Sequence, residues 1–242
     1  MHIETFLLVG IAALIASTLA GITGFGGAAI LLPVLVGAFG TRDAIPILTI
    51  AQLVGNGSRV WFNRDKVDYR VVGWFALGGI PMAFAGGLIF ARAPLPELTR
   101  LLGAFLLVVV AWRRLRPGSC FQIKLQSFAL IGAGASFLSA LLGSVGPLMA
   151  PFFLAYGLVK AAYIGTEALA TVVMHITKLV AYREAAVLSN SSVLIGLAFA
   201  PVMIGGSWFG KRIVDRLPAR VFVGLVELIM VAAGLLFLIR GR

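Results

Sequence analysis

The sequence predicts an all-α polytopic membrane protein: two inverted repeats of five membrane segments, with glycine-broken helices or hairpins near the midplane of the bilayer. The first observation behind this fold class is composition, because 60% of the 242 residues are hydrophobic, only 12% are charged, and the mean hydropathy is +1.04. A soluble domain carries about twice that charged fraction. The second observation is that the apolar residues gather in ten stretches. The third is that the last five stretches resemble the first five.

Each apolar stretch is bounded by polar residues or by glycine and proline. The stretches cover residues 4–20, 24–40, 44–62, 71–91 and 98–112, and then 125–142, 145–159, 162–182, 191–210 and 221–239. A helix needs about 20 residues to cross a membrane. The first two stretches of each half are short and separated by glycine, so each pair can form either a full hairpin or a re-entrant one.

Matching landmarks indicate that the second half repeats the first. Ser17–Gly21 resembles Ser139–Gly143, and the other matches are Pro33 with Pro151, Pro81 with Pro201, Gly86 with Gly206, and Pro96 with Pro218. All of these offsets lie between 118 and 122 residues. Because five segments per repeat is an odd number, the second repeat must be inverted relative to the first. We expect a first repeat at 1–112, a basic cytoplasmic linker at 113–124 and a second repeat at 125–242.

The charges of the loops predict the orientation. The net charge is +11, and twelve of the 20 Lys and Arg residues fall in loops on the side of the linker, against six on the opposite side. Short cytoplasmic loops carry the excess of basic residues. We therefore expect a multi-pass protein of the cell inner membrane with both termini outside. No basic run precedes the first stretch, which favours a retained helix over a cleaved signal peptide.

The same sequence bounds the partners and the chemistry. The basic loops are explained by topology, so we expect membrane lipid and a small anion as partners and no nucleic acid. Cys120 is the only cysteine and there are two histidines, so no intrachain disulfide, metal site or cofactor is expected. The protein is predicted not to be an enzyme. Ser144 and His175 leave an intramembrane serine hydrolase as one alternative, and an anion channel is another.

Two glycine-rich breaks form the first candidate site. One break contains Gly24, Gly26 and Gly27, and the other contains Gly146 and Pro147. Glycine and proline interrupt a helix and release backbone N–H groups, and the N-terminus of the resumed helix carries partial positive charge. Matching breaks in inverted repeats are typical of a substrate site. We predict that these N–H groups bind an anion, although close helix packing would also use small residues.

A polar stripe on the third segment of each half forms the second candidate site. The stripes are Gln52, Asn56 and Arg59, and, 119 residues later, Thr171, His175 and Lys178. Both follow i, i+4, i+7 spacing, which is one face of a helix. A cation at the centre of a membrane helix costs at least about 2.5–3.5 kcal/mol. We therefore predict that the two cations attract an anion and that the amide and the imidazole bind it; alternatively, the cations extend from helix ends to the membrane surface.

Two titratable residues are candidates for coupling transport to protons. Histidine titrates near neutral pH, which makes His175 the first candidate. Glu167 extends the second stripe by one turn and is the other. A membrane histidine can instead form only a hydrogen bond to a neighbouring helix.

The size, the duplicated halves and the motif from Gly24 to Leu35 (GFGGAAILLPVL) resemble the TauE/SafE family of membrane transporters, also called sulfite exporters. The pair Gly165-Thr166 also resembles the family pattern, and the resemblance covers nearly the whole chain. The family has three consecutive glycines in each break, which this chain lacks, and Glu167 stands where a small or hydroxyl residue is typical. The resemblance implies transport of a small sulfur-containing anion, such as sulfite, thiosulfate or an organosulfonate.

Together these observations predict a secondary transporter that exports a small sulfur-containing anion by alternating access. A permease for another small organic anion is the alternative within the same class. The exact substrate, the direction of transport, the coupling ion and the oligomeric state do not follow from the sequence.

Overall fold

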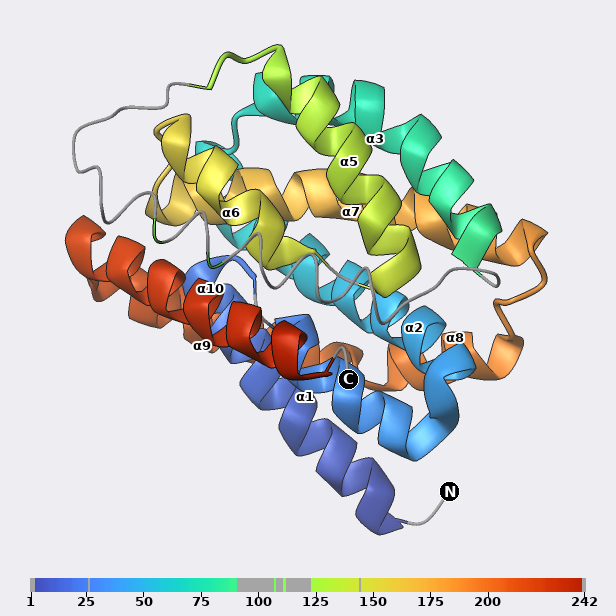
Figure 1. Ribbon diagram of the computed structural model, residues 1–242. Coiled ribbons are helices and arrows are strands. Elements are labelled where there is room, and N and C mark those ends of the chain that lie inside the picture. The colour runs from blue at the N-terminus through green and yellow to red at the C-terminus, as the bar shows by residue number, and fades with distance from the viewer. Residues whose placement is uncertain are drawn as a thin grey trace.

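The computed structural model of the chain describes residues 3–25, 27–90, 107, 111, 123–143 and 145–240, and these residues form helices and no strand. The helices are α1 (Ile3–Thr23), α2 (Gly27–Asn63), the short 3-10 helix η1 (Arg64–Lys66), α3 (Tyr69–Ile89), α5 (Ser127–Leu142), α6 (Gly146–Ala155), α7 (Lys160–Glu184), α8 (Asn190–Ala198), α9 (Ala200–Arg216) and α10 (Ala219–Arg240), as Figure 1 shows. The predicted all-α class is confirmed. The predicted segment 98–112 and most of the predicted linker 113–124 lie outside the described residues.

Helix length separates the membrane-crossing candidates from shorter pieces. Among the described residues, Glu4–Thr23 of α1, α3 and α7 are long and apolar enough to cross a membrane, and α8 with α9 forms a fourth candidate bent by 41°. Ile30–Gly40, α5 and α6 are shorter. The 10 residues of α6 rise about 15 Å, against a hydrocarbon core of about 30 Å. Helix α6 cannot cross by itself, which favours the re-entrant form of its hairpin.

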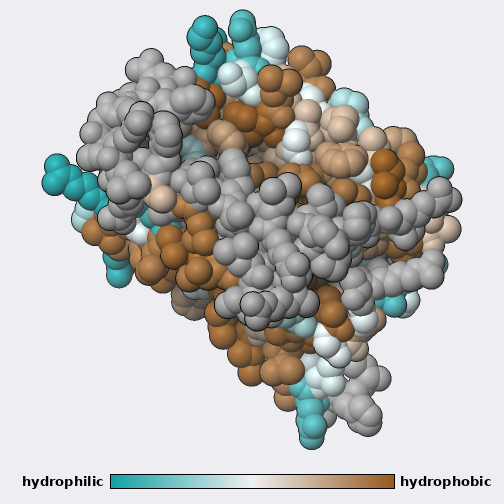
Figure 2. All heavy atoms as spheres, viewed as in Figure 1, coloured by the Kyte–Doolittle hydropathy of each residue, from teal (hydrophilic) through white to brown (hydrophobic). Residues whose placement is uncertain are grey.

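The outer surface suits contact with lipid. Figure 2 shows apolar side chains over much of the visible face, with hydrophilic ones at its margins. On α1, Leu7, Leu8 and Ile11 have exposed fractions of 58%, 61% and 60%. A soluble protein rarely leaves such a row of large apolar side chains in water. The chain is therefore a multi-pass membrane protein whose apolar helices face the bilayer.

The structure bears on two predicted boundaries, one of which agrees with it and one of which differs. The predicted boundary between the segments 24–40 and 44–62 agrees with the structure, because α2 consists of two helical parts that meet at a kink at Gly40, where φ is 75°, ψ is 161° and the backbone is not helical. The segment 191–210 is not one helix, because it breaks at Phe199 into α8 and α9. Helix α9 then continues to Arg216, stabilised by an i,i+4 ion pair of 3.0 Å between Lys211 and Asp215. Lys211, Arg212 and Arg216 follow the predicted segment 191–210 and are among the twelve basic residues expected in loops, but they lie on a helix.

Close pairs of helices are built on glycine. Helix α1 packs on α9, where a Cβ on Gly210 would lie 2.6 Å from the Cα of Gly21. Helix α3 packs on α5, where a Cβ on Gly132 would overlap the carbonyl of Phe75. Small residues let helix backbones approach closely in membranes. The glycines of these two pairs are therefore packing residues.

The packing is reciprocal between the two halves of the chain. Helix α1, the first of its half, packs on α9, which belongs to the fourth predicted segment of the other half. Helix α5, the first of the second half, packs on α3, the fourth of the first half. The helices in third position, the latter part of α2 and α7, pack on each other. This third pair lies at the centre of the arrangement in Figure 1 and carries both polar stripes.

Candidate functional site

The two glycine-rich breaks have the same local structure. Helix α1 ends before Gly24 and helix α5 before Gly143, each glycine has a φ of 84°, and each N–H donates to the carbonyl four residues earlier, at 2.8 and 2.9 Å. Helices α2 and α6 then begin at Gly27 and Gly146. Gly24 and Gly143 are 119 residues apart, as are Gly27 and Gly146, so the register of the breaks equals that of the polar stripes. The match of Gly21 with Gly143 is therefore displaced by three residues.

This geometry changes which backbone groups can bind an anion. The N–H of Gly24 is already bonded to the carbonyl of Ala20. Proline has no N–H, so Pro147 offers none, and the N–H of Leu148 donates to Val145 at 2.9 Å. The first-turn N–H groups of a helix have no partner within that helix. The N–H groups of Gly27 and Gly146 are therefore the candidate backbone donors to an anion. Gly26 lies outside the described residues.

The structure brings the two breaks together. Phe25 of the first break lies against Gly146 of the second, where a Cβ would be 2.7 Å from that of Phe25. Thr23 donates to the carbonyl of Phe25 at 2.8 Å and so fixes the turn of the first break. Helix α7 contacts both breaks, because Tyr163 packs on Gly24 and Lys178 donates to the carbonyl of Gly143 at 3.0 Å.

Helices α2 and α7 run antiparallel, which places the two polar stripes beside each other. The end of α2 lies at the start of α7, where a Cβ on Gly165 would be 3.0 Å from that of Asn63. The other ends meet in a cluster that contains Ile45 and Tyr182. The middles of the two helices therefore lie side by side, and these carry Gln52 and Asn56 on α2 and Thr171 and His175 on α7.

Arg59 is held from within its own helix. Its exposed fraction is 4%, its Nη2 donates to Oδ1 of Asn56, and its Nε has no hydrogen-bond partner. The amide of Asn56 in turn donates to the carbonyl of Gln52 at 2.8 Å. Asn56 thus orients Arg59, and its amide retains a second N–H.

Lys178 of α7 is fully buried, and its side chain contacts the C-terminal end of α5. Its Nζ donates to Oγ of Ser139 at 3.2 Å and to the carbonyl of Gly143 at 3.0 Å. A cation at a helix C-terminus is stabilised by the helix dipole. An ammonium group has three N–H donors, so one remains beyond these two neutral acceptors. The burial of Lys178 and of Arg59 argues against cations that extend to the membrane surface.

Polar atoms without hydrogen-bond partners gather around these cations. They include Nε of Arg59, both ring nitrogens of His175, Oη of Tyr163 and Oε2 of Glu167. His175 interacts electrostatically with both Lys178 and Arg59. Buried polar groups normally have partners, so a cluster of exceptions calls for an explanation.

Glu167 belongs to the Arg59 end of this cluster. Its Oε1 accepts from Thr171 at 3.1 Å, and its carboxylate interacts electrostatically with Arg59. The two groups come from helices α7 and α2, so the pair bridges the central helices. Glu167 therefore has an opposite charge nearby on another helix. On its own helix, Lys178 stands 11 residues away, which is too far for an ion pair within one helix.

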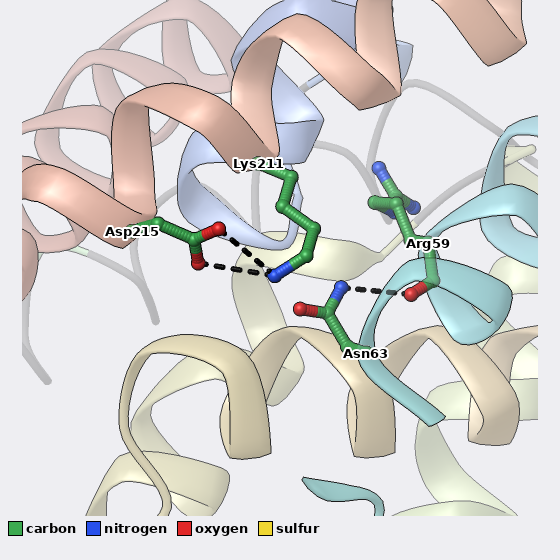
Figure 3. A network of polar contacts seen from close by, with 4 residues as sticks. All are labelled: Arg59, Asn63, Lys211 and Asp215. Carbon is green, nitrogen blue, oxygen red and sulfur yellow. Dashed lines mark hydrogen bonds and ion pairs between the residues drawn. The ribbon is translucent and has the colours of Figure 1, made fainter. Parts of the chain in front are cut away.

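The structure adds residues that the sequence did not single out. Tyr163 and Ser139 reach the cluster from α7 and α5, and neither stands on a predicted stripe. At the end of α2, the amide of Asn63 donates to the carbonyl of Arg59 at 2.8 Å. Figure 3 shows the ammonium of Lys211, on α9, pointing toward Asn63 while it is bonded to Asp215. Tyr163 stands one turn before Glu167 on α7, so the spacing of the stripe could have indicated it. The contact of Ser139 with Lys178 lies between helices and could not be read from spacing.

No group of three or more His, Cys, Asp or Glu side chains in the described part of the chain could hold a metal ion. The remaining chemistry is that of two buried cations and uncommitted donors, which suits a small anion.

Comparison with known proteins identifies the family. A family model described as "Sulfite exporter TauE/SafE" matches residues 9–237, which is nearly the whole chain. No significant match was found among curated proteins or among solved structures. The match agrees with the apolar helices of the structure. The chain belongs to the TauE/SafE family of membrane transporters, the sulfite exporters.

Proposed function

We propose that the protein is a secondary transporter that exports a small sulfur oxyanion, such as sulfite, across the cell inner membrane. Family membership gives the class of membrane transporter. The proposal adds that the substrate binds in the seam between α2 and α7, next to both glycine breaks.

The observation that supports this site best is the buried cluster around Arg59, His175 and Lys178. Two basic side chains lie within the protein, and the ring nitrogens of His175 and Nε of Arg59 have no hydrogen-bond partner. With Glu167 as the nearest acid, the cluster carries an excess of positive charge. A small anion would balance that charge and accept hydrogen bonds from these donors.

The remaining site residues take supporting roles in this proposal. Asn56 orients Arg59, and Thr171 orients Glu167. Gln52 and Pro147 shape the seam, while the N–H groups at Gly27 and Gly146 add partial positive charge. Gly24 makes room for Tyr163.

The reciprocal packing supports an alternating-access mechanism with two inverted repeats. A rocking motion would act on the helices of one repeat against those of the other, around a site between α2 and α7. The equal register of the breaks and the stripes, 119 residues in each case, agrees with such a repeat.

Glu167 is the residue that we propose for proton coupling, with His175 as the second candidate. The carboxylate of Glu167 accepts a hydrogen bond from Thr171 and interacts electrostatically with Arg59 and Tyr163. A dianion would bring excess negative charge next to Glu167, and uptake of a proton there would remove that conflict. In liposomes, Glu167→Gln should still bind sulfite but should no longer accumulate it in response to a pH gradient; accumulation equal to that of the wild type would contradict this role.

Ligand binding is the direct test of the substrate class. The purified protein would be melted in detergent with sulfite, thiosulfate, sulfoacetate, sulfate, acetate or chloride. A ligand that binds only the folded state raises the melting temperature. At a concentration of 100 times its Kd, it adds about 2.7 kcal/mol to the free energy of unfolding. Selective stabilisation by a sulfur anion, followed by its flux in liposomes, is the expected result. Stabilisation by acetate alone would instead identify a carboxylate permease.

A further inference from the structure

We propose that Tyr163 is a substrate-binding residue, whose hydroxyl donates a hydrogen bond to an oxygen of the bound sulfur oxyanion beside Arg59. This inference rests on the proposed function and names a contact that the polar stripes do not contain. Tyr163 stands four residues before Glu167 on α7.

The first argument is the hydroxyl itself. Tyr163 has an exposed fraction of 0%, yet its Oη has no hydrogen-bond partner. A buried tyrosine hydroxyl usually finds a partner, because leaving it unsatisfied costs about 1–3 kcal/mol. The other buried tyrosine of α7, Tyr182, follows this rule and donates to the carbonyl of Ala140 at 2.6 Å.

The second argument is the charge around it. Tyr163 interacts electrostatically with Arg59 and with Glu167. Nε of Arg59 and Oε2 of Glu167 also lack hydrogen-bond partners. Three uncommitted groups, two from α7 and one from α2, therefore meet at one end of the cluster. An oxyanion there would pair with Arg59 and would need a neutral donor on the side of Glu167, which a tyrosine hydroxyl supplies.

The third argument is that the ring is held in place. It packs edge-on against Phe153, with centroids 6.2 Å apart, and against Phe222, with centroids 5.7 Å apart. It also lies on Gly24, where any side chain would overlap it, and where the φ of 84° favours glycine. The absence of a side chain at Gly24 thus leaves room for the ring of Tyr163, and the packing of that ring fixes the position of its hydroxyl.

The test is the affinity for sulfite of Tyr163→Phe, which removes the hydroxyl and keeps the ring contacts. Affinity would be taken from the rise of melting temperature with sulfite concentration. We expect the Kd to increase at least about 10-fold, the effect of losing a hydrogen bond to a charged group. The matched control is Tyr182→Phe, whose hydroxyl bonds to the backbone; it should lower the ligand-free melting temperature and leave the Kd unchanged.

Two results would overturn the inference while leaving the proposed function intact. One is a wild-type Kd for Tyr163→Phe. The other comes from the double variant Tyr163→Phe, Glu167→Gln: if the effect of the tyrosine disappears in the Glu167→Gln background, the hydroxyl acts on Glu167 and not on the substrate. Absence of sulfite binding and flux in the wild-type protein would overturn both the inference and the proposed function.

A second pair of variants keeps the test available if Tyr163→Phe does not fold. Tyr163→His retains a ring with an N–H donor, whereas Tyr163→Leu retains bulk without one. The inference requires tighter sulfite binding by Tyr163→His, and equal affinities for the two variants would contradict it.

Discussion

At the residue scale, the chemistry of the central cluster depends on two basic side chains of a kind that membrane helices rarely carry. Arg59 and Lys178 are both buried, but they are held differently. Arg59 is positioned by Asn56 of its own helix, whereas Lys178 closes the end of α5 through Ser139 and Gly143. A substitution of Lys178 therefore removes both its charge and a contact between helices. The hydrogen bond of Arg59 to Asn56 stays within one helix, so the effect of an Arg59 substitution on transport reports more directly on substrate binding.

The first prediction concerns these cations. Arg59→Ala and Lys178→Ala should each reduce sulfite flux in liposomes at least about 10-fold, because charge-assisted hydrogen bonds are worth about 1.5–3 kcal/mol. The control is Arg64→Ala, which removes an exposed cation that lies 3.9 Å from Asp65 and should leave flux unchanged. Wild-type flux in both Arg59→Ala and Lys178→Ala would assign these cations to structure alone.

At the element scale, glycine has two separable roles. In the α1–α9 and α3–α5 pairs it permits close backbone approach, and at Gly40 it permits a backbone conformation that other residues rarely adopt. The chain offers a matched control for each role, since other glycines of the same helices have open space at the position of a Cβ.

The second prediction concerns the close helix pairs. Gly210→Ala and Gly132→Ala should lower the melting temperature in detergent, because overpacking costs about 1–3 kcal/mol. Gly205→Ala on α9 and Gly134→Ala on α5 have nothing within 4 Å of the added Cβ. These two should keep or slightly raise the melting temperature, since alanine is the better helix former by about 0.5–1 kcal/mol. Equal effects of the two sets would show that contact between these helices does not limit stability.

The third prediction concerns the bend of α2. Gly40→Ala places a Cβ in open space, so any loss of stability must come from the backbone, whose φ is 75°. The cost of that conformation is about 1–3 kcal/mol. Gly37→Ala, one turn earlier and equally open, should be neutral in the same melting experiment. A neutral Gly40→Ala would mean that the backbone conformation at Gly40 does not limit stability.

At the scale of the whole molecule, the reciprocal helix pairs suggest how the chain sits in the membrane. If the repeats are inverted, the loop between α7 and α8 and the linker at 113–124 lie on opposite sides. The basic residues of the linker then place it in the cytoplasm.

The fourth prediction tests this topology. Cys120, the single cysteine, should react with a membrane-impermeant maleimide only from the cytoplasmic side. Ser191→Cys in a Cys120→Ser background should react only from the outside, because Ser191 is exposed in the structure at the start of α8. Labelling of both cysteines from the same side would rule out the inverted arrangement.

The family and the helical class could be predicted from the sequence, because apolar composition and short glycine motifs are local properties. The two stripes were also readable, since Asn56 and Arg59 lie on one face of a helix by spacing alone. The interruption at Gly40 was also readable, since the predicted segments end at 40 and resume at 44, but the break at Phe199 was not. A few polar residues do not reveal whether a helix stops, bends or continues, and tertiary packing decides among these.

The sequence by itself therefore determined the membrane class, the positions of the two polar stripes and the glycine breaks, since each depends on residue type and spacing. Only the tertiary structure decided that the breaks touch each other, that Glu167 lies near Arg59 and that Tyr163 rests on Gly24. These are contacts between segments far apart in the chain. Their physical cause is the close, antiparallel packing of α2 on α7, which no pattern within a single helix specifies.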